Sequence, residues 1–166
     1  VNVTQFQKPQ SSGPNCWNAS LVAAKIIPQL RYSTPQEMSF WLQSPLCKEK
    51  KSNEALAPGD IIAILNKSGH QHHGFVYISE NLSFSKNGVD SDNPYSLQDP
   101  KHVFAKYSVK PKCERTDKQG TCANHAKYYS CMSMDEYRKS YKTTDKTLQE
   151  TIQSINSLEC SFSKSL

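Results

Sequence analysis

The chain has 166 residues, enough for one domain with a hydrophobic core and too few for two domains of ordinary size. Its lysines are interleaved with acidic residues, so the net charge of +5 forms no basic stripe, and no nucleic-acid binding is expected. No apolar run approaches the roughly 18 residues that a membrane-spanning helix needs, and we expect no membrane span.

The first two predicted elements are helices. One covers residues 16–27, where Asn15 is a suitable N-cap, an alanine-rich apolar run follows, and Pro28 ends the helix. The other begins at Thr34, which starts a capping-box pattern with proline at the first helical position, and ends before Pro45.

A solvated, lysine-rich loop is predicted over residues 48–53, and strands follow it. The strands are indicated by runs of β-branched and aromatic residues between turn residues. The turns between these runs are tight, which favours an antiparallel meander. The predicted strands are residues 61–65, 73–78, 82–87 and 102–110.

The sequence changes in character after Pro111. It becomes rich in cysteine and then, from about Asp135, polar with apolar residues at helical spacing. We therefore predict a main domain over residues 1–110 and a cysteine-rich helical extension over residues 111–166. Disulfides are expected to staple this extension, which packs on the same domain.

The number of cysteines points to an oxidising compartment. Six cysteines exceed what a protein of the reducing cytosol usually keeps, so a secreted or periplasmic location is expected. If Cys16 stays a free thiol, five remain, and one of them, with Cys47 as the candidate, is unpaired or bonded to another molecule. The connectivity stays open, and the possible pairs are Cys113–Cys122 and Cys131–Cys160.

A zinc site is the rival interpretation of the same region. Its donors would be Cys113, Cys122, His125 and Cys131. The spacing lacks a short Cys-x-x-Cys knuckle, and a further cysteine offers a disulfide partner. Disulfides are therefore favoured, and neither a metal nor a cofactor is expected.

One cysteine stands at a position that favours chemistry. Cys16 follows the predicted N-cap, so its sulfur lies near the unpaired N–H groups and the positive dipole end of the first helix. These groups favour the thiolate over the thiol and predict a nucleophile near neutral pH. For an isolated cysteine, the alternative is a half-cystine or a buried small apolar residue.

A reactive cysteine needs a base, and histidine is the usual one. Three candidates come just before the strand predicted to begin at residue 73, namely His70, His72 and His73. If residues 79–81 form a three-residue hairpin loop, residue 73 pairs with residue 87. This register favours His73, whereas a two-residue turn would bring His72 to the same face.

The same register supplies a third residue. Asn87 would face His73 directly and Ser85 diagonally, and either polar side chain is suited to orient the imidazole. We favour Asn87 over Ser85, while simple turn chemistry explains Asn87-Gly88 equally well.

The start of the chain resembles papain-type cysteine peptidases. Gln10 stands six residues before Cys16, and Trp17 follows the cysteine directly. In those peptidases a glutamine at that offset lends its amide to the oxyanion hole, so the resemblance implies this role for Gln10. Pro14 and Asn15 stand where the papain signature has a second cysteine and a glycine.

The middle of the chain is similar to NlpC-type and CHAP-type cell-wall peptidases and amidases. The similar segments are Leu56-Ala-Pro-Gly-Asp60-Ile-Ile and His73-Gly-Phe-Val-Tyr-Ile. In these families a cysteine on a helix precedes a Pro-Gly-Asp turn into a strand, a histidine on the next strand and a polar third residue. The resemblance covers residues 10–90. It implies an α+β, papain-like fold in which the cysteine-bearing helix packs on an antiparallel sheet.

The resemblance implies a thiol hydrolase that cleaves amide or peptide bonds through a thioester acyl-enzyme. The implied substrate is peptidoglycan or a peptide, and the implied catalytic residues are Cys16, His73, Asn87, Ser85 and Gln10. Two alternatives stay open. One is the same fold acting on a protein as an acyltransferase, transglutaminase or deamidase, and the other is a catalytically silent, secreted binding module.

Overall fold

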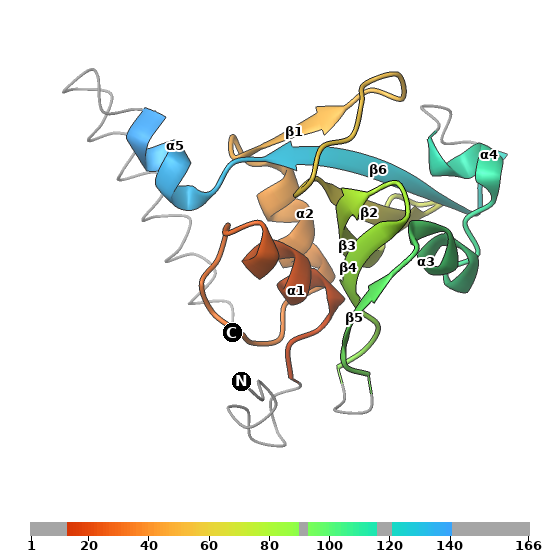
Figure 1. Cartoon of the computed structure of the whole chain (residues 1–166), viewed down its shortest axis with the longest axis horizontal. Coiled ribbons are helices and arrows are strands. Elements are labelled where there is room, and N and C mark those ends of the chain that lie inside the picture. The colour runs from red at the N-terminus through yellow and green to blue at the C-terminus, as the bar shows by residue number, and fades with distance from the viewer. Residues whose placement is uncertain (1–12, 90–92, 116–120, 141–166) are drawn as a thin grey trace.

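An antiparallel sheet forms the centre of the fold (Figure 1). The computed structural model describes residues 13–89, 93–115 and 121–140, and within them the sheet has six strands in the order β1-β6-β2-β3-β4-β5. The α+β class and the antiparallel sheet are thus confirmed. The strands are β1 (Cys47–Lys50), β2 (Ile61–Asn66), β3 (Gln71–Ser79), β4 (Leu82–Lys86), β5 (Tyr95–Gln98) and β6 (Asn124–Cys131).

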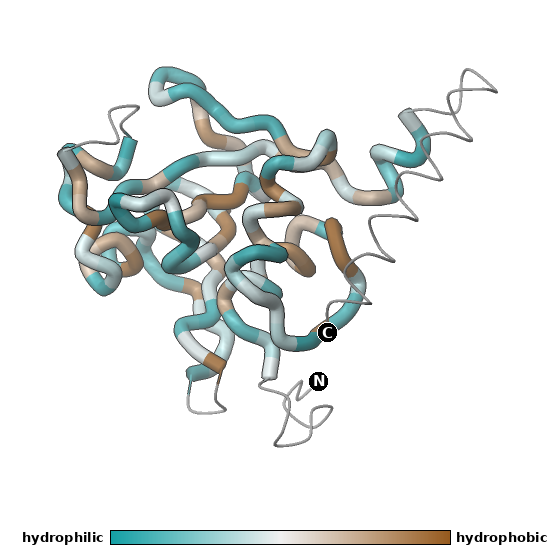
Figure 2. Tube along the Cα trace, turned by 180° about the vertical axis from the view of Figure 1, so that it is seen from behind, coloured by the Kyte–Doolittle hydropathy of each residue, from teal (hydrophilic) through white to brown (hydrophobic). Residues whose placement is uncertain are grey.

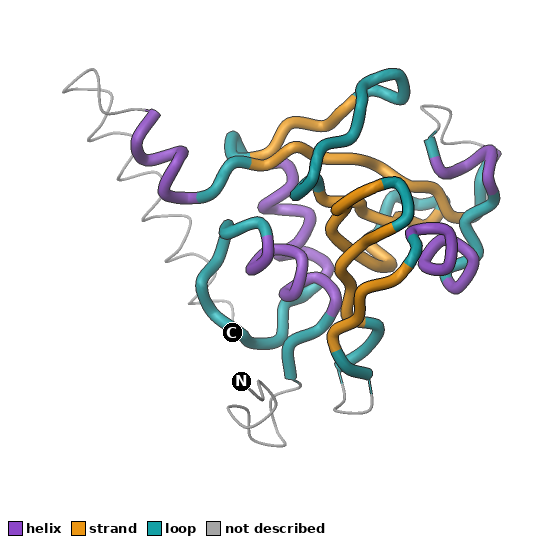
Figure 3. Tube along the Cα trace, viewed as in Figure 1, coloured by secondary structure: helices purple, strands orange, loops and turns teal. Residues whose placement is uncertain are grey.

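Helices lie around this sheet (Figure 3). The second predicted helix is confirmed, and the Thr34 side chain accepts the Glu37 amide as the capping box requires. The first helix ends four residues earlier than predicted, because the chain turns through Lys25 with a φ of 56° and the Ile26 amide bonds back to Leu21. The helices are α1 (Cys16–Ala23), α2 (Pro35–Gln43), α3 (Pro100–Lys106), α4 (Pro111–Glu114) and α5 (Met134–Ser140).

The apolar strand β2 serves two hydrophobic clusters because its side chains alternate between the faces of the sheet. Ile61, Ala63 and Leu65 pack with α1 and α2, whereas Ile62 and Ile64 pack with α3 and the cysteine-rich region. Figure 2 shows the hydrophobic segments gathered where helices meet the sheet and hydrophilic loops around them. The continuous apolar run of β2 is explained by this burial on both faces.

Two predicted segments have a different structure. The predicted loop 48–53 contributes residues to β1, which pairs with β6 at the edge of the sheet. The predicted strand 102–110 is mostly helix α3. Its start was signalled by Asp99, whose side chain accepts the Lys101 amide, and by Pro100 at the first helical position.

The residues after Pro111 are not only helical. Strand β6 lies between β1 and β2 and pairs with both, so it is an interior strand of the sheet. The prediction of a helical extension is therefore wrong for residues 124–131. The predicted helix from about Asp135 is present as α5, and the residues from 141 onward lie outside the described part.

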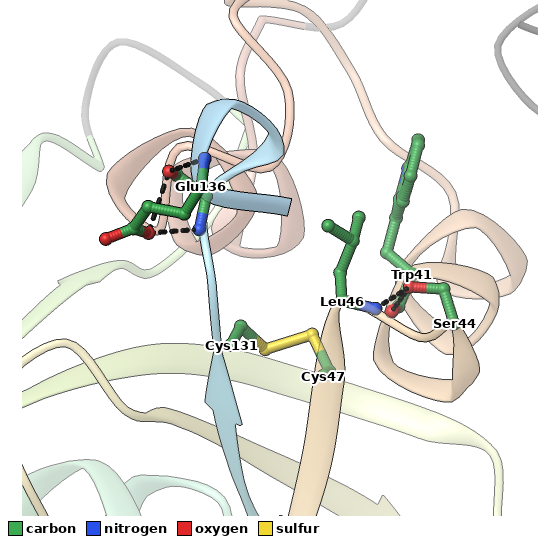
Figure 4. Close-up of a disulfide and its surroundings, with 7 residues drawn as sticks. Trp41, Ser44, Leu46, Cys47, Cys131 and Glu136 are labelled. Atoms are coloured by element: carbon green, nitrogen blue, oxygen red, sulfur yellow. Dashed lines mark hydrogen bonds between the residues drawn. A yellow bond between two sulfur atoms is a disulfide. The ribbon is translucent and has the colours of Figure 1, made fainter. Parts of the chain in front are cut away.

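Two disulfides hold this region. Cys113 is bonded to Cys122, as one of the predicted pairings had it. Cys131 is bonded to Cys47 on the neighbouring strand, so the expectations of an unpaired Cys47 and of a Cys131–Cys160 pair are wrong. Figure 4 shows this bond between β1 and β6, with the end of α2 on one side and the start of α5 on the other.

The β3–β4 hairpin keeps the predicted register with a different turn. Ser79 pairs with Leu82, so the loop has two residues instead of three. A bulge between Tyr77 and Ser79 then shifts the register by one, and Val76 pairs with Phe84 as a three-residue loop would have required. The bulge therefore keeps His73, not His72, on the buried face.

None of the helices within the described ranges is long and apolar enough to cross a membrane.

Candidate functional site

The site begins at the first residue of α1. The side chain of Asn15 accepts the Asn18 amide at 3.1 Å and donates to the Ser33 carbonyl at 2.7 Å, which fixes the helix start against the loop that follows α1. Cys16 is thereby placed at the helix N-terminus as predicted, with 8% of its surface exposed. Of the cysteines in the described residues, it is the one outside a disulfide.

A glycine in β3 lets the helix approach the sheet at this point. A Cβ on Gly74 would lie 2.9 Å from Met38 Cε and 3.3 Å from Ser20 Oγ, so these side chains of α2 and α1 would have to shift to admit a larger residue. The Gly74 amide forms a hydrogen bond with the Cys16 sulfur. The thiol therefore contacts the residue that directly follows His73.

His73 is fully buried and has two unlike ring nitrogens. Its Nε2 lies 3.1 Å from the Ser85 hydroxyl, which in turn lies 3.2 Å from Asn87 Oδ1. An amide oxygen can only accept a hydrogen bond, so the Ser85 hydroxyl donates its proton to Asn87 Oδ1. The Ser85 oxygen then accepts a hydrogen bond from Nε2 of His73. This arrangement selects the tautomer with the proton on Nε2 and leaves Nδ1 as the basic nitrogen.

The basic nitrogen has no hydrogen-bond partner among the described residues. A buried imidazole nitrogen without a hydrogen-bond partner costs free energy. A contact that forms only during function would explain why this nitrogen is left without one. The ring of Tyr107, at the end of α3, stacks on the imidazole with centroids 3.9 Å apart and planes at 15°. Burial raises the pKa of Tyr107 to about 12, and the charge of the Cys16 thiolate adds to this shift.

Burial makes both groups neutral in this arrangement. It raises the pKa of Cys16 to about 11, although the amides of Gly74, Trp17 and Cys16 itself and the charge of Lys86 act in the opposite direction. Burial, with the charges of Lys106 and His72, lowers the pKa of His73 to about 3. The expectation of a resting thiolate is therefore wrong, since desolvation outweighs the helix end.

The other predicted residues are placed as follows. Gln10 lies outside the described residues. His70 and His72 are exposed, and His72 makes an edge contact with Tyr107. Asp60, in the Pro-Gly-Asp turn, is 3% exposed and accepts from Lys50 Nζ and the Ala57 amide, which gives it a structural role at the start of β2.

Three further residues contribute to this site and were not predicted from the sequence. They are Gly74, Lys86 and Tyr107, and only Gly74 had a signal, as a glycine within a strand next to the candidate base. The zinc alternative is excluded for Cys113, Cys122 and Cys131, whose sulfurs form disulfides. Within the described ranges no three His, Cys, Asp or Glu side chains gather in a way that could hold a metal ion.

Comparisons of this chain with protein-family models, with curated proteins and with solved structures found no match.

Proposed function

We propose that this protein is a cysteine hydrolase of amide bonds, with Cys16 as nucleophile and His73 as general base. The observation that carries the proposal is the direction of the Ser85 hydrogen bonds, which leaves His73 Nδ1 basic and without a partner. The hydrogen bond from the amide of Gly74, which directly follows His73, to the Cys16 sulfur supports the pairing of the thiol with this nitrogen.

The neutral state of both groups favours proton transfer during attack over a preformed ion pair. As the Cys16 sulfur bonds to the substrate carbonyl carbon, its proton moves to His73 Nδ1. His73 then gives this proton to the leaving amine, and a thioester remains. A water molecule then attacks the thioester and gives a proton to Nδ1. As the acid is released, His73 passes this proton to the departing sulfur, which restores the thiol.

The surroundings of the sulfur suit negative charge. Backbone amides of Cys16, Trp17 and Gly74 act on it, and such amides can also stabilise the oxyanion of a tetrahedral intermediate. The Gln10 amide is the proposed second oxyanion donor on the papain likeness. Removal of one such donor commonly costs about 3 kcal/mol of transition-state stabilisation.

The proposed substrate is peptidoglycan, and the proposed location is the periplasm or the cell exterior. Both follow from the likeness to NlpC-type and CHAP-type hydrolases. Two disulfides are typical of an oxidising compartment, and a net charge of +5 is compatible with an anionic polymer.

A catalytically silent binding module is the second candidate, and one observation favours it. Cys16 is 8% exposed and His73 is fully buried, so a substrate would have to reach groups with little or no exposed surface. A silent module would keep these side chains only for packing.

Digestion of purified cell-wall sacculi tests the proposal. The wild-type chain should release soluble fragments with new amine ends, detected by mass spectrometry. Cys16→Ala should abolish the release, and His73→Ala should slow it at least ~100-fold. His72→Ala is the matched control in an exposed neighbour and should stay close to wild type.

Intact sacculi with the wild-type chain would count against peptidoglycan. A protein substrate and an amine donor would then test the acyltransferase alternative through the ammonia released or the new amide formed. Failure of both reactions, with correctly folded protein, would leave the binding module.

A further inference from the structure

A buried lysine follows Ser85 at the end of β4. Lys86 is 3% exposed, although lysine is almost never fully buried unless its charge is compensated. Its Nζ donates to the carbonyl oxygens of Gly88 at 2.9 Å and of Asn93 at 2.6 Å, and it lies 5.9 Å from the centroid of the Tyr95 ring. These contacts hold a positive charge at a defined place inside the protein.

The same contacts hold the backbone next to Asn87. Lys86 directly precedes Asn87 in the chain, and Gly88, whose carbonyl oxygen accepts from the Lys86 ammonium, directly follows Asn87. Gly88 has a φ of +156°, and a Cβ there would lie 2.9 Å from Asn93 Cγ, so this part of the connection packs too closely for a side chain. The Lys86 ammonium thus fixes the segment that carries the acceptor for Ser85.

The charge of Lys86 also acts on the nucleophile. Helix α1 packs on β4, the strand that carries Lys86, as well as on β3. Among the influences that lower the pKa of Cys16, Lys86 is the charged side chain, and the others are backbone amides. Burial of the thiol outweighs them all in the resting state.

We propose that Lys86 is a positioning residue with two tasks. Its ammonium holds the backbone around Asn87, and its charge stabilises the thiolate that forms when Cys16 attacks. The inference rests on the proposed function, because a thiolate has a use only if Cys16 reacts. Tyr107 at the end of α3 is a further ionisable group that the charge of the thiolate reaches.

The test measures Cys16 itself and needs no substrate. Iodoacetamide alkylation at about pH 9, below the pKa of the thiol, proceeds in proportion to the thiolate fraction. We expect Lys86→Met to slow alkylation about tenfold, which corresponds to one pKa unit. The chemical shift of isotope-labelled Cys16 Cβ follows the same titration without any need for reagent access.

Three further variants separate charge, hydrogen bonding and folding. Lys86→Gln keeps a donor for the carbonyls without the charge, so it should slow alkylation while the nitrogen chemical shifts of His73 keep the Nε2–H tautomer. Lys86→Arg keeps the charge and should restore most of the alkylation rate. Lys106→Met removes an exposed lysine that acts on His73, and it should leave Cys16 at the wild-type rate.

A Lys86→Gln protein that is folded and alkylates at the wild-type rate would overturn the electrostatic task. Wild-type His73 nitrogen shifts in a folded Lys86→Met protein would overturn the anchoring task. Neither measurement uses a substrate. Failure of the proposed function would appear only in the digestion of sacculi, so the two proposals can fail separately.

Discussion

Ser85 donates its hydroxyl proton to Asn87 Oδ1, and this direction decides which nitrogen of His73 is basic. The two polar residues were alternatives in the sequence, whereas in the structure they act in series. Ser85 contacts the imidazole, and Asn87 fixes the direction in which Ser85 can donate. Two substitutions follow from this order.

Removal of Asn87 should change the tautomer without removing the contact. In Asn87→Ala the Ser85 hydroxyl is free to donate to Nε2, which would shift the proton of His73 to Nδ1. We expect kcat to fall about tenfold or more, in the range typical of general-base contributions, with little change in KM. The nitrogen chemical shifts of His73 should report the new tautomer in the same protein.

Ser85→Ala should behave differently. It leaves Nε2 of a buried imidazole without its partner, at a cost of about 1–3 kcal/mol in the free energy of unfolding. Urea unfolding of both variants separates the two effects, since Asn87 is half-buried and should contribute less to stability. Equal tautomer populations in wild type and Asn87→Ala would contradict the series arrangement.

The thiol of Cys16 should react slowly at neutral pH. Because its pKa is raised to about 11, the thiolate fraction at pH 7 is smaller than in free cysteine. Alkylation rates should rise with pH through the range in which free cysteine has already levelled off. A rate that levels off near pH 6 would instead reveal a preformed ion pair with His73.

The stability of the protein should fall with acid. The imidazole of His73 is neutral in the folded state with a pKa lowered to about 3, so between about pH 6.5 and pH 3 the unfolded chain binds more protons. This contribution is fully present above about pH 6.5. It is lost as the pH falls, with a slope of about 1.4 kcal/mol per pH unit in the free energy of unfolding.

His125 should add to this acid sensitivity. It is 1% exposed, neither ring nitrogen has a partner among the described residues, and burial lowers its pKa. His125→Leu should therefore reduce the slope of stability against pH, measured by urea unfolding at a series of pH values. His70→Leu, in an exposed loop, is the control and should keep the wild-type slope. An unchanged slope in His125→Leu would show that this histidine does not limit acid stability.

The two disulfides should stabilise the fold by different amounts. In the chain-entropy model, a loop closed by residues 84 apart is worth about 4–5 kcal/mol, and one closed by residues 9 apart about 3 kcal/mol. Replacement of Cys47 and Cys131 by serine should thus lower the unfolding midpoint more than replacement of Cys113 and Cys122. The reverse order would mean that the long loop stays compact in the unfolded chain.

Local signals were sufficient for the early elements. The Thr34 capping box, the apolar run of β2 and the hairpin after His73 were predictable because their hydrogen bonds join residues near in sequence. The strands β1, β5 and β6 were missed, and β6 in particular gains its partners from strands far away in the chain. Its sequence alternates little, since it is buried on both faces.

The sequence determined which residue types form the candidate site. The tertiary structure determined their hydrogen-bond order and their protonation states. A cysteine after a helix cap, and a histidine one strand from a serine and an asparagine, can be read along the chain. The charge state of Cys16 and the tautomer of His73 cannot, because burial and the direction of a hydrogen-bond chain depend on side chains that meet only after folding. The same holds for Lys86 and Tyr107, which contribute to the site through contacts that no local pattern encodes.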